Sequence, residues 1–141
     1  MFRLGIPTTL LAALVLTGCG GETTGPIQPG EWEIISTTGA PNGGRIDQAV
    51  TKRCLRSRQG DPTREIVLEL ISRDSCEADK VAIAGGRISG ALQCPEYYSF
   101  SAHEEPVAGR YSATTVDLTV DMPLFGHILR QEVKAKRTGE C

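Results

Sequence analysis

Four of the five cysteines are the residues whose type and spacing bear most directly on chemistry: Cys54, Cys76, Cys94 and Cys141. Redox-active and zinc-binding cysteines commonly occur as close pairs such as C-x-x-C, and the sequence contains no such pair. An even number of cysteines in an oxidising compartment instead indicates two disulfides, with three possible pairings. The four cysteines therefore predict structural cross-links, provided that the chain is exported.

The first residues predict export. Residues 1–18 carry a positive charge at Arg3 and then a short apolar run, which is typical of a secretory leader and too short to span a bilayer. The segment Leu16-Thr17-Gly18-Cys19 resembles the lipobox of bacterial lipoproteins, which implies that Cys19 becomes the first mature residue and carries acyl chains such as palmitate. Several chains would anchor the protein to a membrane. Gly20 follows where inner-membrane lipoproteins often have aspartate, so we expect the outer membrane, facing the periplasm.

Position along the chain favours one of the three possible disulfide patterns. The pair Gly85-Gly86 suits the turn of a two-residue hairpin, and two cysteines flank it almost symmetrically. That register sets Cys76 opposite Pro95, one position off, so it requires a bulge on the Cys76 side or pairing that stops short of the cysteines. The favoured pairing joins the hairpin cysteines to each other and the C-terminus to the early strands: Cys76 with Cys94, and Cys54 with Cys141.

The two histidines, His103 and His127, give only a weak indication of a metal site. Zinc could bind His103, Glu104 or Glu105, and His127 if their strands adjoin, but neighbouring loop carboxylates are more often simply solvated. We therefore assign no metal site. The serines lie in no G-x-S-x-G or S-x-x-K motif, and nothing places a base beside a nucleophile. We expect no catalytic residues, no cofactor and no enzymatic activity.

Charge excludes one class of partner. The formal net charge is -2, without the basic surface that neutralises phosphates, so we expect no nucleic acid. Residues 20–29 are rich in glycine, threonine and proline and predict an extended tether. The sequence thus divides into a leader over 1–18, an acylated cysteine and tether over 19–29, and a single domain over 30–141.

Alternation of apolar and polar residues predicts a mainly β domain. The clearest case is 115–122, where Val116, Leu118, Val120 and Met122 share one face. Further strands are expected at 31–34, 80–84, 87–92, 97–102, 107–113 and 129–136. The exception is 62–71, where Asp61 can cap a helix and Pro62 suits its first position. We predict an antiparallel meander that forms a small barrel or half-barrel, with one short helix around 62–71.

The mature domain resembles a family catalogued as a domain of unknown function, number 3617, found in exported bacterial proteins. The matching pieces are Pro29-Gly30-Glu31-Trp32-Glu33, Cys54-Leu55, Cys76, Gly85-Gly86-Arg87-Ile88-Ser89, Cys94, Gly109-Arg110-Tyr111 and Arg137-Thr138-Gly139-Glu140-Cys141. The resemblance implies an exported β domain with paired cysteines and no assigned activity. The segment 61–71 and the Glu104-Glu105 pair depart from the family pattern.

Trp32 is the single tryptophan and lies in a Gly-x-Trp segment that is similar to the first strand of lipocalins. In lipocalins this tryptophan packs near a basic side chain at the closed end of the barrel. Trp32 could line a pocket, but we expect it to pack in the core. A shared fold does not establish a shared function.

The functional expectation is a binding or interaction module on the membrane surface, for a small apolar ligand or a partner protein. The alternative is a structural or accessory lipoprotein that docks to a larger envelope assembly. A hydrolase is the least favoured class, since the sequence has no catalytic motif.

Overall fold

The computed structural model describes residues 25–71, 73, 75–97 and 100–141. The predicted leader and Cys19 lie outside the described residues. The described residues form seven strands and one helix: β1 (Gly30–Gly39), β2 (Arg45–Leu55), α1 (Pro62–Ile71), β3 (Val81–Ala84), β4 (Arg87–Cys94), β5 (His103–Tyr111), β6 (Thr115–Leu124) and β7 (His127–Gly139).

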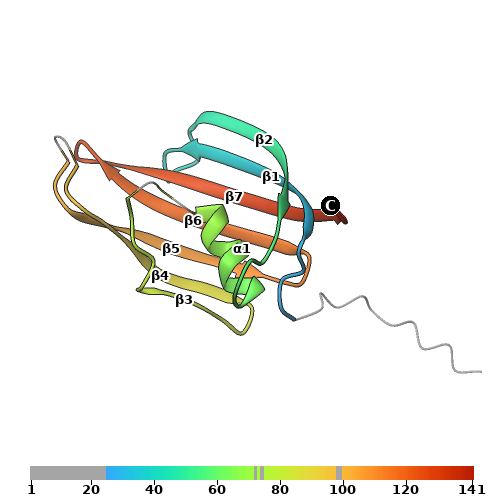
Figure 1. Ribbon diagram of the computed structural model, residues 1–141. Helices are drawn as coiled ribbons and strands as arrows, with labels where there is room; N and C mark the ends of the chain where they lie inside the picture. Colours follow the sequence, from blue (N-terminus) through green and yellow to red (C-terminus); the bar gives the residue numbers. More distant parts are fainter. Residues whose placement is uncertain (1–24, 72, 74, 98–99) are drawn as a thin grey trace, which may run out of the picture.

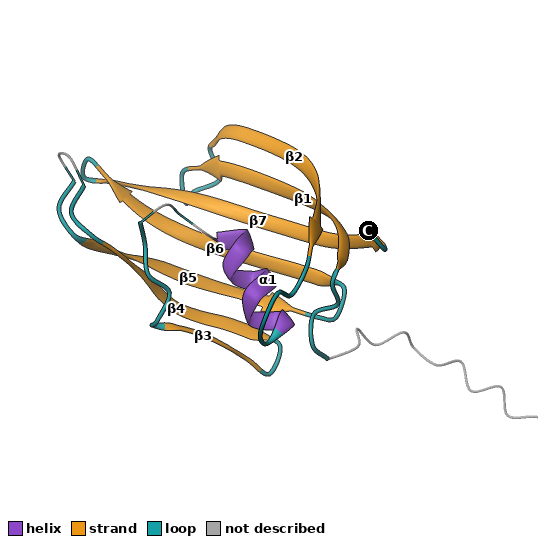
Figure 2. Cartoon of the chain, in the orientation of Figure 1, coloured by secondary structure: helices purple, strands orange, loops and turns teal. Residues whose placement is uncertain are grey.

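All seven strands belong to one antiparallel sheet, in the order β2-β1-β7-β6-β5-β4-β3. Figure 1 shows that the sheet curves around α1, which lies across one face. We call this the inner face, and the opposite face the outer face. The predicted mainly β fold with one helix is confirmed. Within the part of the chain that the structure describes, β2 and β3 are the two edges of the sheet, which is a half-barrel and not a closed barrel (Figure 2).

The core forms between α1 and the inner face because apolar residues alternate along the strands. Val116, Leu118 and Val120 are buried on β6, while the residues between them are more exposed. From α1, Ile66 and Val67 are fully buried against them. This alternation is the pattern that predicted the strand at 115–122.

The helix begins where its capping residue predicts. The Asp61 Oδ1 atom accepts a hydrogen bond from the Thr63 backbone N–H at 3.0 Å, and Pro62 occupies the first helical position. The Thr63 hydroxyl accepts a bond from the Ile27 N–H at 3.0 Å, and Ile27 is buried. The packed residues therefore begin at Ile27, three positions before the domain boundary expected at Gly30, because this apolar side chain fills the end of the core.

Two strand expectations need correction. β2 was not predicted. Its residues 45–54 are exposed on both faces, so apolar and polar residues do not alternate along it. The expected strand at 97–102 is wrong: of the residues described in this range, Tyr97 and Phe100 form an isolated bridge and none belongs to a strand. β5 instead starts at His103 and runs through Pro106, so it includes residues 103–106, which lie between the strands expected at 97–102 and 107–113. Glu105 conceals the alternation because it is a charged residue on the inner face.

The cysteines pair as predicted, Cys54 with Cys141 and Cys76 with Cys94, with Cα–Cα distances of 5.7 and 4.2 Å. The expected offset in the Gly85-Gly86 hairpin is present. The regular pairing of β3 with β4 stops at Val81. Before it in the chain, Glu77 forms an isolated bridge with Gln93, and the register of this bridge differs by one residue from that of the hairpin. The shift brings the two hairpin cysteines opposite each other.

Candidate functional site

A buried carboxylate marks the part of the sheet where chemistry is concentrated. Among the described residues, Glu105 is the only charged one in a buried position, with 6% of its surface exposed. It lies on the inner face of β5, two residues before the buried Val107. A charge in such a position requires nearby partners to offset the cost of removing it from water.

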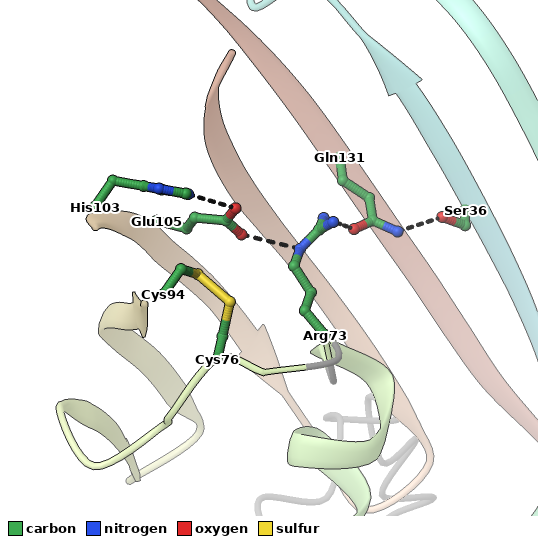
Figure 3. A network of polar contacts seen from close by, with 7 residues as sticks. All are labelled: Ser36, Arg73, Cys76, Cys94, His103, Glu105 and Gln131. Carbon is green, nitrogen blue, oxygen red and sulfur yellow. Dashed lines mark hydrogen bonds and ion pairs between the residues drawn. A yellow bond between two sulfur atoms is a disulfide. The ribbon is translucent and has the colours of Figure 1, made fainter. Parts of the chain in front are cut away.

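Arg73, which follows α1, supplies the opposite charge. Its Nε lies 2.9 Å from the Glu105 Oε2, and neither buried atom has a hydrogen-bond partner in the described structure, so the contact is an ion pair without a well-directed hydrogen bond. The Nη2 of Arg73 donates to the Gln131 Oε1, and the Gln131 Nε2 donates to the Ser36 Oγ at 2.9 Å. Figure 3 shows this polar network, which reaches from β5 across β7 to β1.

His103 forms the other end of the network. Its Nε2 lies 3.3 Å from the Glu105 Oε1, and its Nδ1 lies 2.9 Å from the carbonyl oxygen of Ser101. Both ring nitrogens therefore face acceptors, and both can donate together only when the ring is protonated. Arg73 and a protonated His103 would then share the single carboxylate of Glu105, as Figure 3 illustrates.

Three potential metal donors come together in the described structure. One ligand atom from each of Cys94, His103 and Glu105 lies within 4.8 Å of the others. Cys94 is bonded to Cys76, so its sulfur is not a thiolate that could bind a metal. The remaining two donors are fewer than the three or four that zinc uses.

The zinc set considered from the sequence is not assembled. One of the two histidines of that set, His127, begins β7 next to the β6–β7 turn. It does not belong to the group of potential donors around Glu105. Glu104 lies on an exposed part of β5, where the Lys80 Nζ is 2.8 Å from its Oε1. This hydrogen bond and the lysine charge hold the pKa of Glu104 below its ordinary value.

A cavity of about 590 Å³ adjoins the network. Its walls combine the polar groups of Arg73, His103 and Glu105 with an apolar side formed by Phe100, Met122 and Leu124, and the Cys76–Cys94 disulfide also lines it. The volume falls within the range of roughly 300 to 1,000 Å³ that is typical of small-molecule sites. The cavity therefore offers an apolar compartment with a few polar groups on one wall.

An aromatic hairpin tip lies beside the cavity. Phe125 is 80% exposed in the β6–β7 turn and has a φ of 49°, a left-handed conformation that is uncommon for a bulky residue. Its ring centroid lies 5.1 Å from that of Phe100, which lines the cavity. The two-residue turn between β6 and β7 requires a positive φ at both Phe125 and Gly126, so this backbone conformation follows from the hairpin, and the exposed ring is what distinguishes the tip.

Trp32, for which the sequence allowed a pocket or a core position, lies in the core. It is fully buried on β1, and its Nε1 donates to the Gln28 carbonyl at 3.2 Å. It pairs across the sheet with Arg137 of β7, a basic neighbour like that expected from the similarity to lipocalins. Because Trp32 has no exposed surface, the binding residues must be sought elsewhere.

Sequence reasoning identified His103 and Glu105 but missed Arg73, Gln131 and Ser36. The sequence did indicate a buried carboxylate: Glu105 lies two residues before Val107 in an alternating segment, so both side chains lie on the same face of the strand. A carboxylate on that face needs a cation, but nothing in the sequence indicates that Arg73, 32 positions away in number, supplies it.

The fold and site define a class: a half-barrel of antiparallel strands around one helix, with two disulfides and an open cavity at a buried ion pair. A family model described as "Protein of unknown function (DUF3617)" matches residues 27–141, and the chain belongs to this family. The family expected from the sequence motifs is thereby confirmed.

The other comparisons give no further relative. No curated protein and no solved structure matches the chain. Among the described residues, no helix is both long and apolar enough to cross a membrane.

Proposed function

We propose that this chain is a lipid-anchored binding module of the cell envelope, and that its domain takes a small, mainly apolar ligand into the cavity beside Glu105. The observation that carries the proposal is the cavity itself, which joins an apolar wall at Met122 and Leu124 to a preformed ion pair. Ligand pockets commonly combine mainly apolar walls with a few placed polar groups.

The polar wall indicates the orientation of the ligand. Arg73 is held by Glu105 on one side and by Gln131 on the other, so it is fixed before any ligand binds. A ligand with an apolar body and one hydrogen-bonding end would place that end toward Arg73 and His103. Groups that are already positioned lose little conformational entropy on binding.

The anchoring part of the proposal rests on the sequence. The leader over 1–18 and the lipobox ending in Cys19 favour export and acylation, and two disulfides are typical of an oxidising compartment. Gly20 favours the outer membrane, with the domain facing the periplasm. The lipid chains would hold the cavity close to a source of apolar molecules.

A non-catalytic role is supported by the surroundings of His103. Both of its ring nitrogens face acceptors, the carbonyl of Ser101 and the carboxylate of Glu105, so in these contacts neither nitrogen faces a hydroxyl or thiol that it could deprotonate. General-base catalysis needs a ring nitrogen within hydrogen-bonding reach of the group that it deprotonates.

The first experiment is native mass spectrometry of the full chain purified from the envelope of its own host. A reproducible added mass, beyond that of the acylated chain, is the expected result. A probe titration follows with N-phenyl-1-naphthylamine, an apolar dye that becomes fluorescent in an apolar site. The wild-type chain should bind the dye saturably.

A matched pair of variants locates the site. Leu124→Glu places a charge in the apolar wall and should weaken dye binding at least tenfold, whereas Ile128→Glu places the same charge on the outer face of the same hairpin and should leave binding unchanged. Equal binding by both variants, together with a chain free of added mass, would refute the ligand proposal.

A second candidate function is docking to a larger envelope assembly, and the exposed Phe125 favours it. The exposed Ile128 lies at the same end of the β6–β7 hairpin, and neighbouring exposed apolar residues that form a patch often mark a protein interface. Under this alternative, Phe125→Ser would abolish cross-linking of the chain to an envelope partner and leave dye binding intact.

A further inference from the structure

The outermost strand β2 has an unusually open position in the sheet. Among the described residues it pairs with β1 on one side only, and residues 45–54 are exposed on both faces. An edge strand presents a row of unpaired backbone N–H and C=O groups that can accept another strand. The 11 residues of β2 contain no proline that would interrupt such pairing.

We propose that β2 pairs antiparallel with β2 of a second copy of this chain, around a two-fold axis at Val50. The two seven-stranded sheets would then join into one continuous sheet. This inference is independent of the ligand proposed for the cavity.

Symmetry restricts the registers that such a pair can adopt. Two antiparallel copies of one strand are related by an axis perpendicular to the sheet, so the inner faces of both copies lie on the same side. Residues on one face can therefore oppose only residues on that face. On β2 the inner-face residues are those opposite the inner-face residues of β1, and they are Asp47, Ala49, Thr51 and Arg53.

Charge selects one register among those that remain. With Val50 on the axis, Asp47 of each copy faces Arg53 of the other, which gives two opposite-charge pairs on the inner face. Moving the axis to Ala49 places Asp47 opposite Thr51 and pairs no opposite charges, and Arg45 lies beyond the irregularity at Thr38/Gly39, out of line with the inner-face residues. Moving it to Thr51 pairs no opposite charges. Directly opposed unlike charges stabilise a strand pair and like charges destabilise it, so the Val50 register is favoured.

The groups required for this pairing are available. Arg53 has one distant contact, at 3.8 Å to Glu69 of α1, and both side chains are about half exposed. A guanidinium has five N–H donors, so Arg53 can keep Glu69 and also bind Asp47 of the second copy. On the outer face, the exposed Val50 would be covered by the Val50 of the second copy.

The test is sedimentation velocity of the full chain in detergent micelles over a range of concentrations. The wild type should show a reversible monomer–dimer equilibrium. Asp47→Arg and Arg53→Asp each replace two attractive pairs with two repulsive ones, and each should raise the dimer dissociation constant at least tenfold. The double variant carries the same pairs reversed and should recover most of the wild-type affinity.

The control is Asp117→Arg, which makes the same charge change on an exposed residue of β6, inside the sheet. It should dimerise like the wild type. A chain that stays monomeric at every concentration overturns the proposal. A dimer that both single variants leave unchanged, or that the double variant does not restore, also overturns it, because the contact then lies elsewhere.

Discussion

Replacing Glu105 with leucine tests whether the ion pair between Glu105 and Arg73 stabilises the fold. The substitution removes the carboxylate that lies 2.9 Å from the Arg73 Nε and 3.3 Å from the His103 Nε2. It leaves the partly buried Arg73 guanidinium without its counter-charge. We therefore expect the domain to lose stability.

The magnitude follows from the burial of the two partners. Removing one member of a fully buried pair costs about 3 to 5 kcal/mol. The side chain of Glu105 is 7% exposed, but that of Arg73 is 27% exposed and keeps its contact with Gln131. Water and Gln131 offset part of the loss, so we expect Glu105→Leu to lower the free energy of unfolding by about 2 to 3 kcal/mol.

The combined variant separates the pair from its surroundings. Arg73→Met together with Glu105→Leu removes both charges, and an apolar replacement of a whole buried pair is often neutral. We expect the double variant to be more stable than Glu105→Leu alone, with a coupling energy of about 1 to 3 kcal/mol.

The assay is urea denaturation of the full chain with its disulfides intact, with equal slopes required across the variants. Glu104→Leu is the control, because its carboxylate is exposed and pairs with Lys80 at the surface, so it should resemble the wild type. Arg73→Met is measured alone as well. If the losses of unfolding free energy in Arg73→Met and Glu105→Leu add up to the loss in the double variant, the ion pair makes no specific contribution and the reasoning is wrong.

Three further predictions concern the fold. Replacing Cys54 and Cys141 with alanine opens a cross-link with a sequence separation of 87 and should cost about 4 to 5 kcal/mol in urea denaturation. Gly90→Ala should cost at least about 2 kcal/mol, because Gly90 has a φ of 116° and an added Cβ would meet the backbone, whereas Gly139→Ala should be tolerated. A hydrogen bond from Arg130 lowers the pKa of Asp121 in the folded chain. The Asp121 carboxylate therefore stabilises the fold above the pKa of the unfolded chain, and this stabilisation is lost as the pH falls below about 4. Asp121→Asn should make the free energy of unfolding depend less on pH below about 4.

Each of these predictions has a result that contradicts it. A loss below about 2 kcal/mol for the cysteine variant would mean that the unfolded chain is already compact without the cross-link. Equal stability of the two glycine variants would show that the backbone at Gly90 relaxes freely. An unchanged acid limb for Asp121→Asn would mean that its pairing with Arg130 is as strong in the unfolded chain.

The local elements follow from the sequence because their causes are local. Alternation along 115–122 predicts β6, Asp61 and Pro62 predict the start of α1, and Gly85-Gly86 predicts the hairpin turn. The family and the cysteine pairing also follow from the motifs and the positions of the cysteines. These signals are readable because each depends on neighbours within a few residues or on counting cysteines.

Tertiary structure decides the remainder. β2 has no alternation of its own and exists because β1 supplies its backbone hydrogen bonds. Glu105 is stable on the inner face only because Arg73 and Gln131, from distant parts of the chain, meet there. The sequence by itself thus determines which segments can form strands and which cysteines can pair. Only the folded chain determines which charges become buried partners, because that depends on distances between segments that no local pattern encodes.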